Sequence, residues 1–167
     1  MSIAILGSGV TGLTTAIELR RRGYAADIYT QKLRNTSIPS YAACAIWKPF
    51  LLNNPVSELR IWAQAAWKAF AQLADTTDET GVYRVQHQEC WAQLPEPSQP
   101  YYADIVDRFL YSEAPNAHYA CTWHMGSFDI DMAVYMEWRI ATFTAFGDTC
   151  YERASGWRYA DIHTEVY

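Results

Sequence analysis

The 167-residue sequence predicts an α/β fold in which a βαβ unit is interrupted by an inserted α+β segment. Residues 3–6 form an all-apolar run, which is followed by closely spaced glycines, a helical pattern and a second strand pattern. Residues 55–75 and the residues after Asp131 repeat apolar side chains at helical intervals, and strand-like patterns lie between them. A chain of this length can bury the core of one large domain or of two small ones.

The first strand is expected over residues 3–6, because a continuous apolar run is typical of a parallel strand that is buried on both faces. The helix that follows carries residues at helical spacing, namely Leu13, Ala16, Ile17 and Arg20. Gly23 is expected to end this helix in a left-handed conformation. The second strand is expected over residues 25–29.

Gly7, Gly9 and Gly12 have the G-x-G-x-x-G spacing between the first strand and the first helix. In that context the first glycine permits a tight turn, the second lets a pyrophosphate approach the backbone, and the third lets the helix pack closely on the strand. The phosphates would then lie at the positive end of the helix. We therefore predict a dinucleotide-binding turn. The alternative is a tight turn with a structural role only.

The end of the second strand differs from the usual pattern, in which an acid binds the ribose. Thr30 and Gln31 stand there, while Asp27 lies inside the strand and is expected to face away from the ribose. The Gln31 amide can bond hydroxyl groups as donor or acceptor. Lys32 and Arg34 could instead favour a 2′-phosphate, which keeps NADP as a rival ligand, or they could be two solvated loop cations.

The inserted segment is predicted to begin with a helix and to continue with strands. Asn54 and Pro55 resemble an N-cap and a first helical residue, and the helix is expected to end near Asp75. Its apolar stripe consists of Leu59, Trp62, Ala66, Phe70 and Leu73. A strand is expected over residues 81–91, and one or two strands are expected over residues 111–125, separated by the loop SEAPN.

The chain is expected to return to its first domain after residue 127. Asp131 can cap a helix that ends at Gly147, and the strand TCYER follows. The apolar stripe of this helix consists of Met132, Tyr135, Met136, Ile140 and Phe143. We therefore divide the chain into residues 1–52, 53–127 and 128–167, with the last part incomplete.

Composition and residue spacing argue against several classes of partner and binding site. The net charge is −5 and the only run of cations, residues 20–22, is expected in the last turn of a helix, so neither nucleic acid nor a membrane is expected as a partner. The four cysteines lie far apart and are expected to be reduced and mostly buried. His118 and His124 lack ligand spacing, so no metal is expected. The absence of an apolar run of about 20 residues and of a signal-peptide pattern predicts a cytoplasmic protein.

Three stretches, AILGSGVTGLTTAIELRRRGYAADIYTQ, YAACAIWKPF and FDIDMAVYMEW, occur together in this chain. In their order and approximate spacing they resemble the D-amino-acid oxidase family of FAD-dependent oxidases, of which glycine oxidase is a more distant relative. The resemblance covers nearly all of the chain but only the N-terminal half of a family member. It implies a Rossmann-like FAD-binding domain with an inserted substrate-domain segment, incomplete at its C-terminal end.

The resemblance also implies roles for individual residues, with FAD as the cofactor. The residues implied at the pyrophosphate are Gly7, Ser8, Gly9, Val10, Thr11 and Gly12. Gln31 and Lys32 are implied at the adenosine ribose, Ala154 at the adenine, and Lys48 on the substrate side. The residues implied against the flavin ring are Ala43, Cys44, Ala45 and Ile46. Gln31 in place of an acid is expected to weaken FAD binding, while Cys44 in place of glycine would crowd the ring or supply a thiol.

The family's reaction converts D-amino acids to 2-oxo acids, ammonia and hydrogen peroxide. The tyrosine and arginine that hold the substrate belong to the half that this chain does not match, so no catalytic residue is assigned and little or no turnover is expected. Two alternatives remain open. One is a non-catalytic nucleotide-binding or split-half module that needs a missing C-terminal half or forms a homo-oligomer, and the other is an NADP-dependent reductase. The preferred D-amino acid is not predicted.

Overall fold

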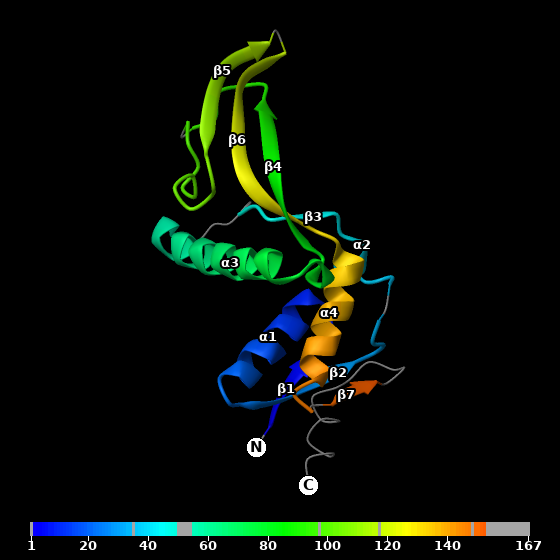
Figure 1. Cartoon of the computed structure of the whole chain (residues 1–167). Coiled ribbons are helices and arrows are strands. Elements are labelled where there is room, and N and C mark those ends of the chain that lie inside the picture. Colours follow the sequence, from blue (N-terminus) through cyan, green and yellow to red (C-terminus); the bar gives the residue numbers. More distant parts are fainter. Residues whose placement is uncertain are drawn as a thin grey trace. The chain divides into compact units, whose positions relative to one another are not determined.

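The structure is a computed structural model that describes residues 2–34, 36–49, 55–96, 98–116, 118–147 and 149–152, apart from the side chains of residues 78 and 114–116. The chain divides into two compact units (Figure 1). Unit 1 combines Met1–Cys44 with Met132–Tyr167, and unit 2 is Ala45–Asp131. Each unit has its own sheet.

Unit 1 is built on a parallel sheet with the strand order β1-β2-β7. Its elements are β1 (Ser2–Leu6), α1 (Val10–Arg21), β2 (Ala25–Thr30), α2 (Pro39–Ala42), α4 (Met132–Thr144) and β7 (Cys150–Glu152). β1 pairs with β2 from Ser2 opposite Ala25 to Leu6 opposite Tyr29. The predicted βαβ unit and the α/β class are therefore confirmed.

Helices α1 and α4 lie side by side over the sheet of unit 1 (Figure 1). The core between them contains the expected apolar residues, which are Leu13, Ala16, Ile17, Met132, Tyr135, Met136, Ile140 and Phe143. The apolar stripe of α4 also includes a cation that the sequence pattern did not suggest. Arg139 is 6% exposed, and its Nε donates to the Tyr135 hydroxyl at 2.8 Å.

β1 is more exposed than the sequence predicts. Ile3 is 40% exposed and Leu6 is 59% exposed, although a parallel strand buried on both faces was expected. Within the part of the chain that the structure describes, β1 is an edge strand, with β2 as its only neighbour. β2 lies between two strands, and its residues Ala26, Ile28 and Tyr29 are buried. The expected burial therefore applies to β2 rather than to β1.

Unit 2 is built on an antiparallel sheet around the long strand β6. Its elements are β3 (Ala45–Ile46), α3 (Val56–Thr76), the 3₁₀ turn η1 (Asp78–Thr80), β4 (Val82–Trp91), β5 (Leu110–Asn116) and β6 (Tyr119–Ile130). β4 pairs along one edge of β6, while β3 and β5 pair with opposite ends of β6. The predicted sequence of helix and strands is confirmed.

Three details of unit 2 differ from the sequence predictions. The residues SEAPN lie inside β5 rather than in a loop, because β6 supplies a pairing partner and an irregularity between Glu113 and Asn116 accommodates the proline. Helix α3 begins at Val56, so Pro55 is its N-cap, and Asn54 lies outside the described residues. Trp62, expected in the apolar stripe, is 50% exposed.

Aromatic side chains form the core of unit 2 beside α3. The rings of Trp47 and Trp67 are 5.0 Å apart, and the rings of Trp67 and Phe128 are 4.6 Å apart. Phe128 and Trp47 belong to the two paired segments at the β3 end of the sheet, where the Trp47 amide donates to the Phe128 carbonyl at 2.8 Å. Helix packing on the sheet therefore brings these rings into contact, with Trp47 and Phe128 buried.

The boundaries between the units differ from those suggested by the sequence at 52/53 and 127/128. Residues 45–46 belong to unit 2 because β3 pairs with β6, and β6 itself continues to Ile130.

The four cysteines are free, but only Cys121 is buried, while Cys44 and Cys90 are exposed. Among the described residues, no helix has the length and apolar character needed to cross a membrane.

Candidate cofactor-binding site

The turn between β1 and α1 depends on a glycine in a left-handed conformation. Gly7 has φ +98°, a region that side chains rarely tolerate, and its amide donates to the Tyr29 carbonyl at 2.8 Å. This hydrogen bond ties the turn to the end of β2. The chain can therefore reverse direction immediately after the strand and present its backbone at the sheet's carboxyl edge.

Gly12 allows α1 to lie directly against this turn. A Cβ atom added at Gly12 would lie 2.0 Å from the Gly7 carbonyl oxygen, a distance that no side chain could occupy. At Gly9, an added Cβ would lie 3.0 Å from the Ser40 hydroxyl. The first and third glycines of the motif are thus required by the backbone and by packing, as the spacing predicts.

The amino end of α1 is suited to an anion. Gly9 is its N-cap and supplies no side-chain partner, and the first turn contains no acid. The first amides of a helix have no intrahelical acceptor and carry the positive end of its dipole. In this structure the Val10 amide donates to the Ser40 hydroxyl at 3.1 Å. A phosphate oxygen would interact with the same end of the helix.

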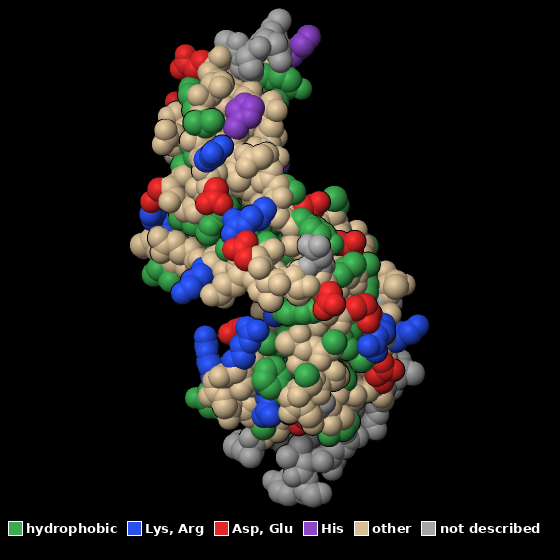
Figure 2. Space-filling view, in the orientation of Figure 1, with side chains coloured by type: hydrophobic (Ala, Val, Ile, Leu, Met, Phe, Trp, Pro, Cys, Tyr) green, Lys and Arg blue, Asp and Glu red, His purple; other side chains and the backbone are tan. Residues whose placement is uncertain are grey.

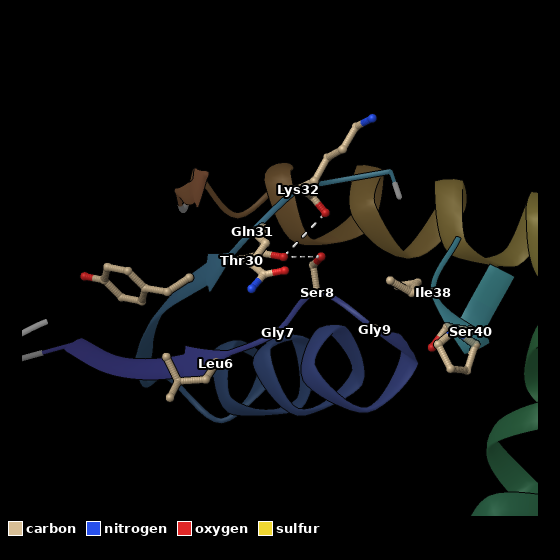
Figure 3. A pocket seen from close by; sticks show the side chains of 11 residues that line it. Leu6, Gly7, Ser8, Gly9, Thr30, Gln31, Lys32, Ile38 and Ser40 are labelled. Carbon is tan, nitrogen blue, oxygen red and sulfur yellow. Dashed lines mark hydrogen bonds between the residues drawn. The ribbon is translucent and has the colours of Figure 1, made fainter. Parts of the chain in front are cut away.

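A pocket of about 520 Å³ opens beside this turn (Figure 3). It is lined by residues from β1 and its turn, from the end of β2 and from the segment at α2. These residues are Leu6, Gly7, Ser8, Gly9, Tyr29, Thr30, Gln31, Lys32, Ile38, Pro39 and Ser40. Its position at the carboxyl ends of parallel strands is where nucleotides bind in open α/β sheets.

Two hydroxyl groups meet across the pocket from the two strand ends. The Ser8 and Thr30 hydroxyl oxygens are 2.9 Å apart and the bond is buried, while Thr30 also donates to the Lys32 carbonyl at 3.5 Å (Figure 3). Gln31 follows Thr30 directly and lines the same pocket. The carboxyl end of β2, where a ribose is expected, therefore carries hydroxyl and amide groups rather than a carboxylate.

The structure brings together some of the residues expected at a cofactor. Gly7, Ser8, Gly9, Gln31 and Lys32 line one pocket, and Val10, Thr11 and Gly12 form the first turn of α1 beside it.

The residues expected at the flavin ring are divided between the units. Ala43 and Cys44 follow α2 in unit 1, whereas Ala45 and Ile46 form β3 in unit 2, so these four stay a prediction. Ala154 lies outside the described residues.

Sequence reasoning missed Thr30, Ile38, Pro39 and Ser40 as lining residues. Thr30 could have been found from its position at the carboxyl end of β2, next to Gln31. The other three could not, because no local spacing reveals that the segment after β2 folds back onto α1. Its contact with the site includes the Ser40 hydrogen bond to Val10 and the close approach of the Ser40 hydroxyl to Gly9.

The geometry of Lys32 and Arg34 gives little support to a 2′-phosphate. The Arg34 Nε donates to Glu137 at 2.8 Å, and this bond raises the pKa of the Arg34 guanidinium. Figure 3 shows the Lys32 side chain directed away from Ser8 and Gly9, so Lys32 lines the pocket chiefly with its backbone. The Arg34 guanidinium is therefore held by an acid, and the Lys32 side chain points away from the glycine turn.

Lys48, expected on the substrate side, lies in unit 2 and is held by an acid. Its ammonium is 2.5 Å from Glu89 and 5.9 Å from the centre of the Trp91 ring. The two charged side chains are 19% and 18% exposed, so the pair is largely withdrawn from water. The charge of Lys48 is therefore balanced within the chain by Glu89. Figure 2 shows Lys and Arg side chains beside Asp and Glu side chains at several places on the visible surface.

The residues at this pocket fit the adenosine and pyrophosphate parts of FAD. The glycine turn cannot accept a Cβ at Gly12, the helix end lacks an acid, and hydroxyl groups lie at the carboxyl end of β2. These are the features that a dinucleotide needs in this fold. Comparison with known proteins identifies the family more closely.

Residues 2–162 match the DAO family, described as FAD-dependent oxidoreductases. The chain is 29% identical over 161 residues to a D-amino-acid oxidase of Streptomyces coelicolor, covering 91% of this chain and 46% of that protein. Among solved structures, it resembles glycine oxidase from Geobacillus kaustophilus with a TM-score of 0.68 and 16% identity, covering 90% of this chain and 46% of that one. L-amino acid deaminase from Proteus vulgaris gives a TM-score of 0.67 and 15% identity, covering 90% and 39%.

The structural likenesses show a shared fold, and the chain spans less than half the length of each of these relatives. The family match covers nearly the whole chain and agrees with the glycine turn, the parallel sheet and the pocket at its carboxyl edge. The chain belongs to the DAO family of FAD-dependent oxidoreductases.

Proposed function

We propose that residues 1–167 supply the FAD-binding part of an amino-acid oxidase, with D-amino acids as the first substrate class to test. The proposal rests on the close contact of Gly12 with the Gly7 carbonyl, which brings the helix end against a backbone-lined pocket. The family match favours FAD, and the D-amino-acid oxidase relative favours D-amino acids over the glycine and L-amino acids in the names of the structural neighbours.

The chain's own residues have separable roles in this proposal. The turn from Gly7 to Gly9 and the first amides of α1 would hold the pyrophosphate. Thr30 and Gln31 would bond the adenosine ribose, with Ser8 fixing the Thr30 hydroxyl at 2.9 Å. The residues 43–46 would lie against the flavin ring. FAD, when bound, accepts the electrons of the oxidation, while the protein binds and orients the reactants.

The substrate side of the proposal involves the Lys48–Glu89 pair. A paired cation and anion that are largely withdrawn from water can orient a small zwitterion without adding net charge to the site. Stereochemical preference would depend on how the remaining walls of the site place the α-carbon. The test must therefore compare D-amino acids, L-amino acids and glycine in parallel.

The first experiment is the visible spectrum of the purified chain before and after addition of FAD, followed by amino acids under nitrogen. Retention of yellow colour after desalting supports FAD binding, and bleaching by D-amino acids alone supports the finer proposal. Bleaching by glycine or L-amino acids would replace the substrate class. A colourless chain, together with no quenching of flavin fluorescence, would overturn the proposal for residues 1–167.

A second candidate function is supported by β1. Its exposed Ile3 and Leu6, together with its edge position in the described sheet, favour a module that completes its sheet with another polypeptide. The test is to add the C-terminal half of the Streptomyces relative as a separate chain. Saturable binding with recovered oxidase activity would support this candidate, and no association at concentrations that permit FAD binding would contradict it.

A further inference from the structure

Glu137 lies on the exposed side of α4 and uses both carboxylate oxygens for contacts with one distant segment. Its Oε2 accepts from the Arg34 Nε at 2.8 Å, and its Oε1 accepts from the Tyr41 hydroxyl at 2.9 Å. Arg34 and Tyr41 are both far from α4 in the sequence. A single side chain therefore holds both residues against one helix.

Arg34 and Tyr41 stand on either side of the residues that line the pocket from α2. Ile38, Pro39 and Ser40 lie between them, and the Ser40 hydroxyl accepts from the Val10 amide at 3.1 Å. Tyr41 follows Ser40 directly within the same short helix. The route from Glu137 to the amino end of α1 thus passes through two contacts and one peptide bond.

The segment after β2 contains little regular structure. α2 has only four residues and no side-chain hydrogen bond at its N-cap, and no strand of the described sheet includes residues 31–44. Arg34 has φ 55°, a left-handed conformation that costs free energy in a residue other than glycine. Besides Glu137, the Leu33 amide donates to Glu152 at 2.7 Å. Side-chain contacts, including those of Glu137, therefore help to fix this segment.

We propose that Glu137 is a positioning residue for the FAD site. By holding Arg34 and Tyr41, it keeps Ser40 at the amino end of α1, where the pyrophosphate would bind. The inference rests on the proposed function for its ligand, but the positioning itself belongs to the chain without FAD. An isolated surface ion pair contributes little, whereas a carboxylate that restrains both flanks of a segment lowers the ordering cost of binding.

The variant Glu137→Gln tests the proposal, with Glu18→Gln as its matched control. Glu18 forms an exposed ion pair with Arg21 on α1, so both variants remove one surface carboxylate from an ion pair. We expect Glu137→Gln to weaken FAD binding about five-fold and Glu18→Gln to change it by less than about two-fold. Equal effects of the two variants on FAD affinity would overturn the proposal.

A double-mutant cycle distinguishes positioning of Ser40 from a general loss of stability. Ser40→Ala removes the hydroxyl through which Glu137 is proposed to act. In that background, Glu137→Gln is expected to have less than about half of its effect on FAD affinity, because coupled residues are not additive. Additive losses would contradict the proposal, as would a fall in FAD affinity that only follows the thermal unfolding midpoint.

Hydrogen exchange of the FAD-free chain separates this inference from the proposed function. Glu137→Gln is expected to speed amide exchange in residues 36–42 about three-fold or more, with β4 unchanged. Unchanged exchange in residues 36–42 would overturn the positioning role even if FAD binds. If the chain binds no FAD while exchange responds as expected, the ligand assignment fails but the positioning of this segment by Glu137 stands.

Discussion

Gly12 in unit 1 and Gly126 in unit 2 each lie where a side chain would collide with another part of the chain. A Cβ at Gly12 would lie 2.0 Å from the Gly7 carbonyl oxygen, and a Cβ at Gly126 would lie 2.9 Å from the Asp107 Cβ. The first contact places a helix end beside the pocket of unit 1. The second places a connecting segment on a sheet, where the Gly126 amide donates to the Asp107 carbonyl at 2.6 Å.

Close packing at a glycine therefore shapes a binding pocket in unit 1, whereas in unit 2 it packs a connecting segment on a sheet. In unit 1 the pocket is lined by the glycine turn, by the hydroxyl side chains of Ser8, Thr30 and Ser40, and by apolar residues at the strand ends and at α2, so its shape depends on main-chain placement. In unit 2 the sheet is packed by large rings such as Trp67 and Phe128, so its properties depend on buried area. Substitutions in unit 1 should therefore change ligand affinity, whereas substitutions in unit 2 should change the free energy of unfolding.

The largest effect is expected from Phe128→Ala in unit 2. Phe128 is fully buried, and its removal should lower the free energy of unfolding of unit 2 by about 3–5 kcal/mol. Hydrogen exchange of β4 and β6 under native conditions would measure this loss. The control Tyr83→Ala removes an aromatic ring that is 40% exposed, and it should cost far less. A large loss of FAD affinity with little change in β4 exchange would contradict the distinction between a ligand-binding unit 1 and a unit 2 held by buried rings.

Gly12→Ala should be the most damaging substitution in unit 1. The new methyl group must displace either α1 or the Gly7 carbonyl, at a cost of about 3 kcal/mol. Because the displaced parts form the turn, we expect FAD affinity to fall more than about ten-fold, as measured by quenching of flavin fluorescence. The exposed α1 residue Thr15 provides the control Thr15→Ala. An unchanged affinity in Gly12→Ala would show that the turn does not hold the cofactor.

Gly126→Ala should lower the stability of unit 2 while leaving FAD affinity nearly unchanged, and its free-energy cost should be smaller than that of Gly12→Ala. Overpacking against Asp107 is expected to destabilise unit 2 by about 1–3 kcal/mol, since its neighbours include the Asp107 backbone oxygen at 3.0 Å. FAD affinity should stay within about two-fold of the original chain. Denaturant unfolding followed by tryptophan fluorescence would measure the first quantity. Loss of FAD binding equal to that of Gly12→Ala would remove the distinction between the units.

The smallest effect concerns alkaline pH and Tyr41. The pKa of Tyr41 is raised from 10.0 to about 12. Burial is the largest cause, and the hydrogen bond to Glu137 is the next largest. A raised pKa means that this contribution to stability is complete below pH 10 and is lost as the pH rises through about 12. Tyr41→Phe should remove this part of the pH dependence in residues 36–42. The measurement is the rate of amide hydrogen exchange as a function of pH, corrected for intrinsic rates. An identical pH profile in the original chain and in Tyr41→Phe would contradict the prediction.

Much of unit 1 could be predicted because its signals are local. The spacing of Gly7, Gly9 and Gly12 implies a turn before a helix, and the stripes of α1 and α4 carry their own periodicity. The edge strands of unit 2 were harder to predict from the sequence. SEAPN reads as a loop by composition, yet pairing with β6 makes it part of a strand, since tertiary hydrogen bonding overrides local preference.

The sequence by itself determined the α/β class, the glycine turn and the family resemblance, since each depends on residues that are close in the chain or on motifs in a preserved order. Only the tertiary structure decided that β1 is exposed, that Arg34 binds Glu137 rather than facing a phosphate, and that Ser40 reaches α1. These contacts join segments that are distant in the sequence. Their formation depends on how the chain closes its loops, which no local spacing specifies.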